Sequence, residues 1–191
     1  MKLRLLAVAG VLVTTGVAGG PGTPYAAAAF SAGAGPHHVA VPGVPGCRLR
    51  QLRLGDGAPV PELTQQETRI FVLRNTSAQR CELTGYPVVA LLTGGGRFLP
   101  FRYRDHGDQM LASARPRAVV LAARGGRAYF GINKSACVTR AAAIAATLTA
   151  WPRGQLTVRV PPYFDYCGRP DPGHVLDVSP FETSVRAVLA W

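Results

Sequence analysis

The sequence predicts an all-β domain, built as a sandwich or a barrel, and three observations support this prediction. The chain has 191 residues, of which 48% are hydrophobic, so it forms one domain with enough apolar material for a core, and a disordered chain is excluded. Short runs of β-branched and aromatic residues recur between clusters of its 22 glycines and 16 prolines. Four cysteines follow an export signal, as in small domains stabilised by disulfides.

The N-terminus has the three-part layout of a secretory signal peptide. Lys2 and Arg4 precede a nearly continuous apolar run, Leu5 to Val17, and Ala26 to Ala29 offers A-x-A cleavage sites. The apolar run is too short for a comfortable transmembrane helix. We therefore expect residues 1–29 to be a signal peptide whose removal leaves no membrane span. The mature protein is then secreted or extracellular, with association with the cell wall as one option.

A linker separates this signal from the folded domain. Residues 30–45 are dominated by Gly, Ala and Pro without a period, which is typical of a flexible segment. The β-domain is expected to span residues 46–191.

The first half of the domain shows strand patterns separated by turn residues. Residues 47–54 alternate apolar and polar with a phase change at Gln51, which predicts a half-buried strand with a bulge, followed by a turn at 55–57. The segment 67–74, Glu-Thr-Arg-Ile-Phe-Val-Leu-Arg, is the strongest strand candidate. Further strands are predicted at 81–83, 88–92 and 97–103, with turns at 75–77 and 94–96.

The second half continues in the same way with one ambiguous segment. Strands are predicted at 118–121, 127–132, 147–151, 156–160 and 175–178. Residues 139–146 are rich in alanine, which favours helix by propensity, so this segment is left open between helix, turn and strand. The tail, 184–191, alternates weakly and is expected to add an edge strand.

The four cysteines, Cys47, Cys81, Cys137 and Cys167, permit three disulfide pairings. The local pairing, Cys47 with Cys81 and Cys137 with Cys167, is favoured because each bond then closes one hairpin-scale loop. In the chain-entropy model a loop of about 30 residues contributes on the order of 3.5 kcal/mol. A zinc site would need C-x-x-C pairs or histidines at ligand spacing, and the sequence has neither.

The charge balance is strongly basic and consists almost entirely of arginine. The chain has 21 basic and 10 acidic residues, a formal charge of +11, and its only lysines are Lys2 and Lys134. A basic sheet face attracts anionic polymers such as wall teichoic acids or phospholipid headgroups, although a codon bias toward arginine gives the same count without a ligand. Nucleic-acid binding is not expected, because the chain is exported and lacks a recognition motif.

The arginines fall in short clusters along the chain. The first cluster is the candidate binding set, because alternation would place two of its members, Arg48 and Arg50, on one face of a strand. The clusters are Arg48, Arg50 and Arg53; Arg97, Arg102 and Arg104; Arg115 and Arg117; and Arg124 and Arg127.

Several motifs resemble those of a known family. Cys47 opens the first strand, and Leu73-Arg74-Asn75-Thr76-Ser77 is followed by Cys81-Glu82-Leu83-Thr84-Gly85-Tyr86-Pro87. Ala128-Tyr129-Phe130 precedes Cys137, and Cys167-Gly168 precedes Leu176-Asp177-Val178-Ser179-Pro180. Over about residues 46–182 the chain thus resembles the secreted actinobacterial family 4232 of domains of unknown function.

The resemblance implies a two-sheet antiparallel immunoglobulin-like β-sandwich with two disulfides, in an exported or wall-associated protein. It implies no activity. The chain departs from the family in two respects. It lacks the lipid-acceptor cysteine of many relatives, which argues against membrane tethering, and Arg124-Gly125-Gly126 replaces the usual Pro-Gly turn.

The densest polar cluster is Asp105-His106-Gly107-Asp108. Two carboxylates and an imidazole can bind a divalent metal or form an acid–base pair, and Met110 nearby can add a soft ligand. Carboxylates this close in a loop more often cap the backbone of a turn, and we favour that interpretation, so no metal is predicted.

Three aromatic residues, Tyr163, Phe164 and Tyr166, lie beside Cys167. Exposed aromatic rings form platforms for sugars or partner proteins, which makes these residues candidates for binding. In a small domain such rings more often close one end of the core, and the sequence favours that alternative.

No Gly-x-Ser-x-Gly elbow and no phosphate-binding loop occurs in the sequence. We therefore expect a non-enzymatic domain of the cell envelope, without a cofactor, that binds an anionic wall polymer or another envelope protein. One alternative is a secreted protease inhibitor, although no close pair of cysteines braces a reactive loop. The other is a metal-binding or enzymatic domain that uses Asp105, His106 and Asp108.

Overall fold

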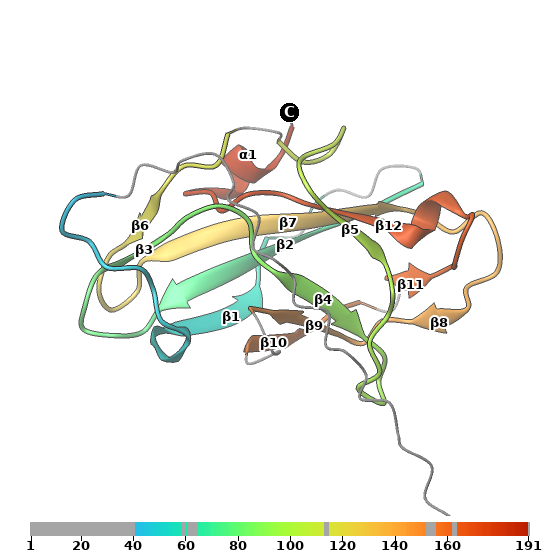
Figure 1. The fold of residues 1–191 in the computed structure, drawn as a ribbon, viewed down its shortest axis with the longest axis horizontal. Helices are drawn as coiled ribbons and strands as arrows, with labels where there is room; N and C mark the ends of the chain where they lie inside the picture. Colours follow the sequence, from blue (N-terminus) through green and yellow to red (C-terminus); the bar gives the residue numbers. More distant parts are fainter. Residues whose placement is uncertain are drawn as a thin grey trace, which may run out of the picture. The chain divides into compact units, whose positions relative to one another are not determined.

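The computed structural model describes residues 41–58, 60, 65–112, 115–151, 156–161 and 164–190 (Figure 1). The predicted signal peptide and the predicted linker up to residue 40 lie outside these described residues. Within them the fold is all-β, as the sequence predicts, with short helical turns between strands. No helix in the described residues is long and apolar enough to cross a membrane.

The largest sheet has five strands in the order β1-β2-β7-β12-β5. These are β1 (Leu52–Asp56), β2 (Gln66–Asn75), β5 (Arg102–Asp105), β7 (Arg127–Ser135) and β12 (Val175–Val178). The long central strands β2 and β7 pair antiparallel over their whole length. Among the paired strands of the described residues, β12 and β5 alone run parallel, which departs from the fully antiparallel sheets that the resemblance implied.

A second sheet of three strands, in the order β10-β9-β4, forms the other layer of the sandwich. It consists of β4 (Val89–Leu92), β9 (Thr147–Ala150) and β10 (Leu156–Arg159). Two small pairs complete the fold: β3 (Cys81–Leu83) with β6 (Val119–Leu121), and β8 (Ala143–Ile144) with β11 (Asp165–Tyr166). Three short helical turns connect strands: η1 (Leu49–Gln51), η2 (Pro172–His174) and α1 (Val185–Val188).

The main core lies between the two layers. Successive side chains of a strand point to opposite faces, and Phe71, Leu73 and Phe130 on the inner face of the large sheet are fully buried. Phe71 and Phe130 are directly opposite in the register, and their rings stack with centroids 5.3 Å apart. They share one apolar cluster with Leu91 and Leu148 of the smaller sheet. Burial of side chains of this size contributes about 1.5–3 kcal/mol each.

A second, smaller core covers the middle of the outer face of the large sheet. Ile70 packs there with Met110, Leu111 and Val188, the last of which belongs to α1. Gly131 of β7 lies directly under this cover, where an added Cβ would be 2.6 Å from Leu111 Cδ2 and 2.9 Å from Val188 Cγ1. This small core does not extend to either end of the outer face.

The predicted disulfide pairing is confirmed. Cys47 is bonded to Cys81 and Cys137 to Cys167, with sequence separations of 34 and 30 residues. The described residues contain no free cysteine. The first bond holds the start of the domain against β3, and the second joins the end of β7 to the segment after β11.

The first predicted strand is shorter at its start and longer at its end than the alternation indicated. Residues 49–51 form the turn η1, because the Gln51 backbone donates to the Arg48 carbonyl at 2.9 Å and the Gln51 side chain accepts from the Arg48 N–H at 2.7 Å. The strand β1 then runs through Asp56, where the sequence predicted a turn. Asp56 is held there by an ion pair with Arg69 of β2.

Two other predicted strands are also corrected. The prediction for 97–103 holds only from Arg102, because Pro100 has no N–H to donate to a ladder. The tail forms the helical turn α1 and not an edge strand, since Ser184 caps it by accepting from the Ala187 N–H at 3.2 Å. Within the alanine-rich segment 139–146, Ala143 and Ile144 form the short strand β8.

Candidate functional site

Three arginines stand directly opposite one another across three neighbouring strands at one end of the large sheet. The register pairs Arg53 of β1 with Arg74 of β2, and Arg74 with Arg127 of β7. Residues that are directly opposite in an antiparallel pair point to the same face of the sheet. We call this set, Arg53, Arg74 and Arg127, the arginine row.

The arginine row faces solvent because of strand alternation. Leu73 and Ala128, the neighbours of Arg74 and Arg127 along their strands, are fully buried in the main core. The three arginines are exposed on the opposite, outer face, beyond the part that α1 covers. Strand pairing fixes the backbone positions of all three, so the row is built on rigid elements.

Two turns at this end of the sheet, one after β2 and one before β7, are tied together by hydrogen bonds. Asn75, which directly follows Arg74, is fully buried, and its Nδ2 donates to the carbonyls of Gln79 at 2.7 Å and Ala122 at 3.1 Å. The Arg124 N–H donates to the Ser77 carbonyl at 2.8 Å. The Asn75-Thr76-Ser77 segment therefore serves the turn chemistry that the sequence predicted, and it anchors the chain on both sides of the row.

Among the described residues, no member of the arginine row forms an ion pair. In the described residues, the arginines within 4.0 Å of a carboxylate are Arg69, with Asp56, and Arg104, with Asp177. A Cβ on Gly125, in the turn before β7, would lie 3.7 Å from the nearest guanidinium nitrogen of Arg74. The Arg74 side chain thus extends over this turn, and its charge has no carboxylate partner there.

The candidate residues Arg48 and Arg50 lie near this end, but they do not share a strand face. Both are exposed and precede β1: Arg50 belongs to η1, and Arg48 is the N-cap of that turn. The η1 turn is bonded to the turn that follows Arg74, because Gln51 Nε2 donates to Ser77 Oγ at 3.1 Å and the Thr76 N–H donates to the Gln51 carbonyl at 2.8 Å. Arg53 alone of the first cluster belongs to the row. Arg74 was missed because sequence alone does not give strand register.

The opposite end of the outer face holds a polar pocket of about 320 Å³, lined among others by Arg104, Asp108, Asn133 and Asp177. Two of its charged groups bind each other: both Asp177 carboxylate oxygens accept from Arg104 at 2.6 Å. Burial raises the pKa of Asp177, and the Arg104 hydrogen bond opposes that shift.

Of the candidate metal residues, Asp108 lines this pocket but Asp105 and His106 do not, and the three are not among the described residues whose ligand atoms come together. Asp108 Oδ1 accepts from the N–H groups of Met110 and Leu111 at 2.7 and 2.8 Å, and its Oδ2 accepts from Asn133 Nδ2 at 2.6 Å. Asp108 thus caps a turn, as the favoured interpretation held. Desolvation raises the pKa of Asp105.

One group of three metal-ligating residue types lies close together within the part of the chain that the structure describes: Cys137, Asp165 and Cys167. Both sulfurs of that group are consumed by a disulfide, so no thiolate is left to bind a metal.

The aromatic candidates belong to the core where the structure describes them. Phe164 is fully buried in the main cluster. Tyr166 is half-buried, and its ring meets Phe101 edge-on with centroids 5.0 Å apart. Tyr163 lies outside the described residues. Neither described ring offers an exposed platform.

A second hollow of about 320 Å³ lies beside the first disulfide and is lined by Cys47, Glu82, Tyr86, Trp151 and Phe181 among others. Desolvation and, to a lesser extent, the charge of Asp105 raise the pKa of the Tyr86 phenol. One of the two carboxylate oxygens of Glu82, Oε2, is already bonded within the domain, because it accepts from the Val41 N–H at 2.9 Å.

Comparison with known proteins identifies the family. Residues 47–182, most of the chain, match the model of a domain of unknown function, DUF4232. The chain belongs to this family. The match begins at Cys47 and therefore includes both disulfides and the arginine row of this DUF4232 domain. No curated protein and no solved structure matched the chain.

Proposed function

We propose that this DUF4232 domain binds a phosphate-rich polyanion of the cell envelope through the arginine row, and that it does so outside the cell without catalysing a reaction. One observation carries the proposal: three exposed arginines are directly opposite one another on three strands, and none is paired with a carboxylate of the described residues. The two disulfides support an oxidising location for the protein.

The spacing of the row suits a polymer of phosphates. Neighbouring strands lie about 4.8 Å apart, so the row spans about 10 Å from β1 to β7. A planar guanidinium group can donate two parallel hydrogen bonds to one phosphate. Because the arginines stand side by side across the sheet, a chain of anions can follow the row perpendicular to the strands.

The electrostatic cost of the row favours a ligand. Like charges that are directly opposite across a sheet destabilise it. A bound anion would reverse the sign of this interaction, because it replaces repulsion between guanidinium groups with attraction to phosphate. Exposed ion pairs are individually weak, so affinity would depend on several contacts made together and would fall with salt.

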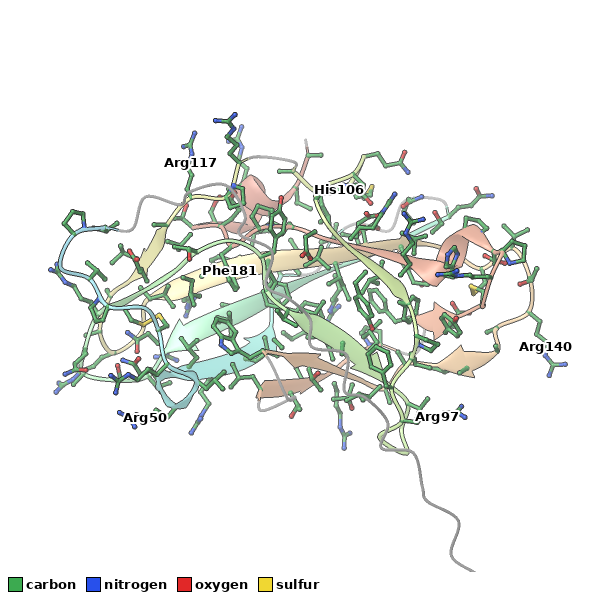
Figure 2. The ribbon with its side chains drawn as sticks, in the orientation of Figure 1. Arg50, Arg97, His106, Arg117, Arg140 and Phe181 are labelled. Atoms are coloured by element: carbon green, nitrogen blue, oxygen red, sulfur yellow. A yellow bond between two sulfur atoms is a disulfide. The ribbon has the colours of Figure 1, made fainter. Side chains whose placement is uncertain are left out.

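The test compares two triple variants of equal charge for binding to immobilised poly(glycerol phosphate). In the first, Arg53, Arg74 and Arg127 are replaced by glutamine. In the second, a matched control, glutamine replaces Arg97, Arg140 and Arg159, which are exposed and likewise have no carboxylate within 4.0 Å in the part of the chain that the structure describes. Figure 2 shows Arg97 and Arg140 at the opposite end of the domain from Arg50, which marks the end that carries the row.

We expect the row variant to bind about thirtyfold more weakly than the wild type at low salt, from about 2 kcal/mol lost over three contacts. The control variant should retain most of the affinity. Equal losses in both variants would show attraction by net charge and would overturn the proposal, as would wild-type binding that persists unchanged at 1 M salt.

A further inference from the structure

Lys134 is a fully buried lysine on the inner face of the large sheet. It lies near the end of β7, and the register places Glu67 of β2 directly opposite it. Its Nζ lies 2.6 Å from Glu67 Oε2, 3.1 Å from Asp165 Oδ1 and 2.9 Å from the carbonyl oxygen of Ser135. Lys2 of the predicted signal peptide is the only other lysine in a chain with 21 basic residues.

Lys134 is buried beside two carboxylates, Glu67 and Asp165. The Lys134 side chain has 0% exposure, whereas those of Glu67 and Asp165 have 15% and 24%. Two carboxylates therefore share one ammonium group, and burial raises the pKa of Glu67. Glu67 Oε2 lies within hydrogen-bond distance of Nζ and can accept a proton from it, and this transfer neutralises two charges whose burial is costly. That transfer creates a neutral amine in contact with a carboxyl group.

We propose that Lys134 and Asp165 form an intramolecular isopeptide bond, with Glu67 transferring the proton. The Lys134 nitrogen attacks Cγ of Asp165, a new N–Cγ bond forms, and one Cγ–O bond breaks. The ammonium and carboxylate groups together yield an amide and one water molecule, which carries away the departing oxygen with two protons. Glu67 takes two protons from Nζ one after the other, delivers each to the departing oxygen, and is an unprotonated carboxylate again at the end. The reaction needs no oxidant and no co-reactant.

The fold holds the reacting atoms in place. Lys134 is fixed by strand pairing in β7, and Asp165 by the pairing of β11 with β8. The Cys137–Cys167 disulfide joins the two segments three residues after Lys134 and two after Asp165. Groups held together in this way react as if at very high concentration, which removes much of the entropic barrier to amide formation.

Mass spectrometry of the purified, disulfide-bonded protein tests the proposal. Trypsin should release residues 128–140, which contain Lys134, and residues 160–186, which contain Asp165. The disulfide also joins these two peptides, so reduction separates them unless a second bond exists. We expect them to remain joined after reduction, uncleaved at Lys134, with a combined mass lower by about 18 Da, one water.

Two variants identify the chemistry. In Asp165→Ala the acyl group is absent, and in Glu67→Gln the proton carrier is replaced by a side chain of the same size; we expect both proteins to have the full, uncondensed mass. Separation of the wild-type peptides on reduction, with normal cleavage after Lys134, would overturn the proposal and leave a buried ion pair. A bond between residues 128–140 and 54–69, the peptide with Glu67, would overturn the assignment of Asp165.

Discussion

The repulsion within the arginine row can be measured through the stability of the domain. Arg74 is the central member and is directly opposite both Arg53 and Arg127. Cross-strand pairs contribute about 0.2–1 kcal/mol, with an unfavourable sign for like charges. Replacing Arg74 by threonine, which suits an exposed strand position, removes two such pairs. We therefore expect Arg74→Thr to raise the free energy of unfolding by about 1 kcal/mol at low salt.

The salt dependence of this gain is the critical observation. At 1 M ionic strength the Debye length falls to about 3 Å, less than the spacing of about 4.8 Å between strands, so repulsion is screened and the gain should shrink. Urea unfolding of wild type and variant at about 0.02 M and 1 M salt measures both values. A variant that is less stable than the wild type at low salt, or a gain that salt does not change, would refute the reasoning. Arg97→Thr serves as a control, because Arg97 is exposed in a loop with no arginine opposite it.

Two further predictions concern packing and pH. Gly131→Ala should lower the free energy of unfolding by about 1–3 kcal/mol, because the new Cβ would lie 2.9 Å or less from Leu111 and Val188; unchanged chemical denaturation would contradict this. Burial alone would raise the pKa of Asp171, but hydrogen bonds from Thr139, Gly173 and Val138 outweigh it and hold the pKa at about 2. A lowered carboxyl pKa adds stability that is present above about pH 4 and is lost as the pH falls through about 2. The wild type should therefore be more stable than Asp171→Asn at pH 6, and this advantage should disappear near pH 2 in thermal unfolding; an equal difference at both values would contradict the assignment.

The sequence predicted the parts of the fold that depend on local pattern. The apolar run from Ile70 to Leu73 identified β2, and cysteine spacing gave the correct disulfides. The errors came where a few specific hydrogen bonds override alternation. Gln51 closes a turn inside an apparently alternating segment, and Ser184 starts a helical turn in a tail that looked extended.

The candidate sites were harder to predict because they depend on register. Arg74 and Arg127 are 53 positions apart in the printed sequence, and only the pairing of β2 with β7 makes them neighbours. Likewise, nothing in the segment around Lys134 indicates that Glu67 and Asp165 approach it. One signal was present: a lysine retained in a domain whose other cations are all arginine. The densest polar cluster of the sequence, at 105–108, supplies a turn cap through Asp108, which is the interpretation that the sequence favoured.

The first disulfide also determines how the domain responds to mechanical force. Cys47 and Cys81 enclose a loop with a sequence separation of 34 that contains both β1 and β2. Tension applied to the chain ahead of Cys47 passes through the disulfide to Cys81 in β3. The enclosed residues are therefore not under tension, and the chain between the two cysteines cannot be extended. The second disulfide likewise keeps tension off the chain between Cys137 and Cys167, which contains β8, β9, β10 and β11. Reduction should therefore lengthen the extension of a single pulled molecule in two separate increments, one for each loop released.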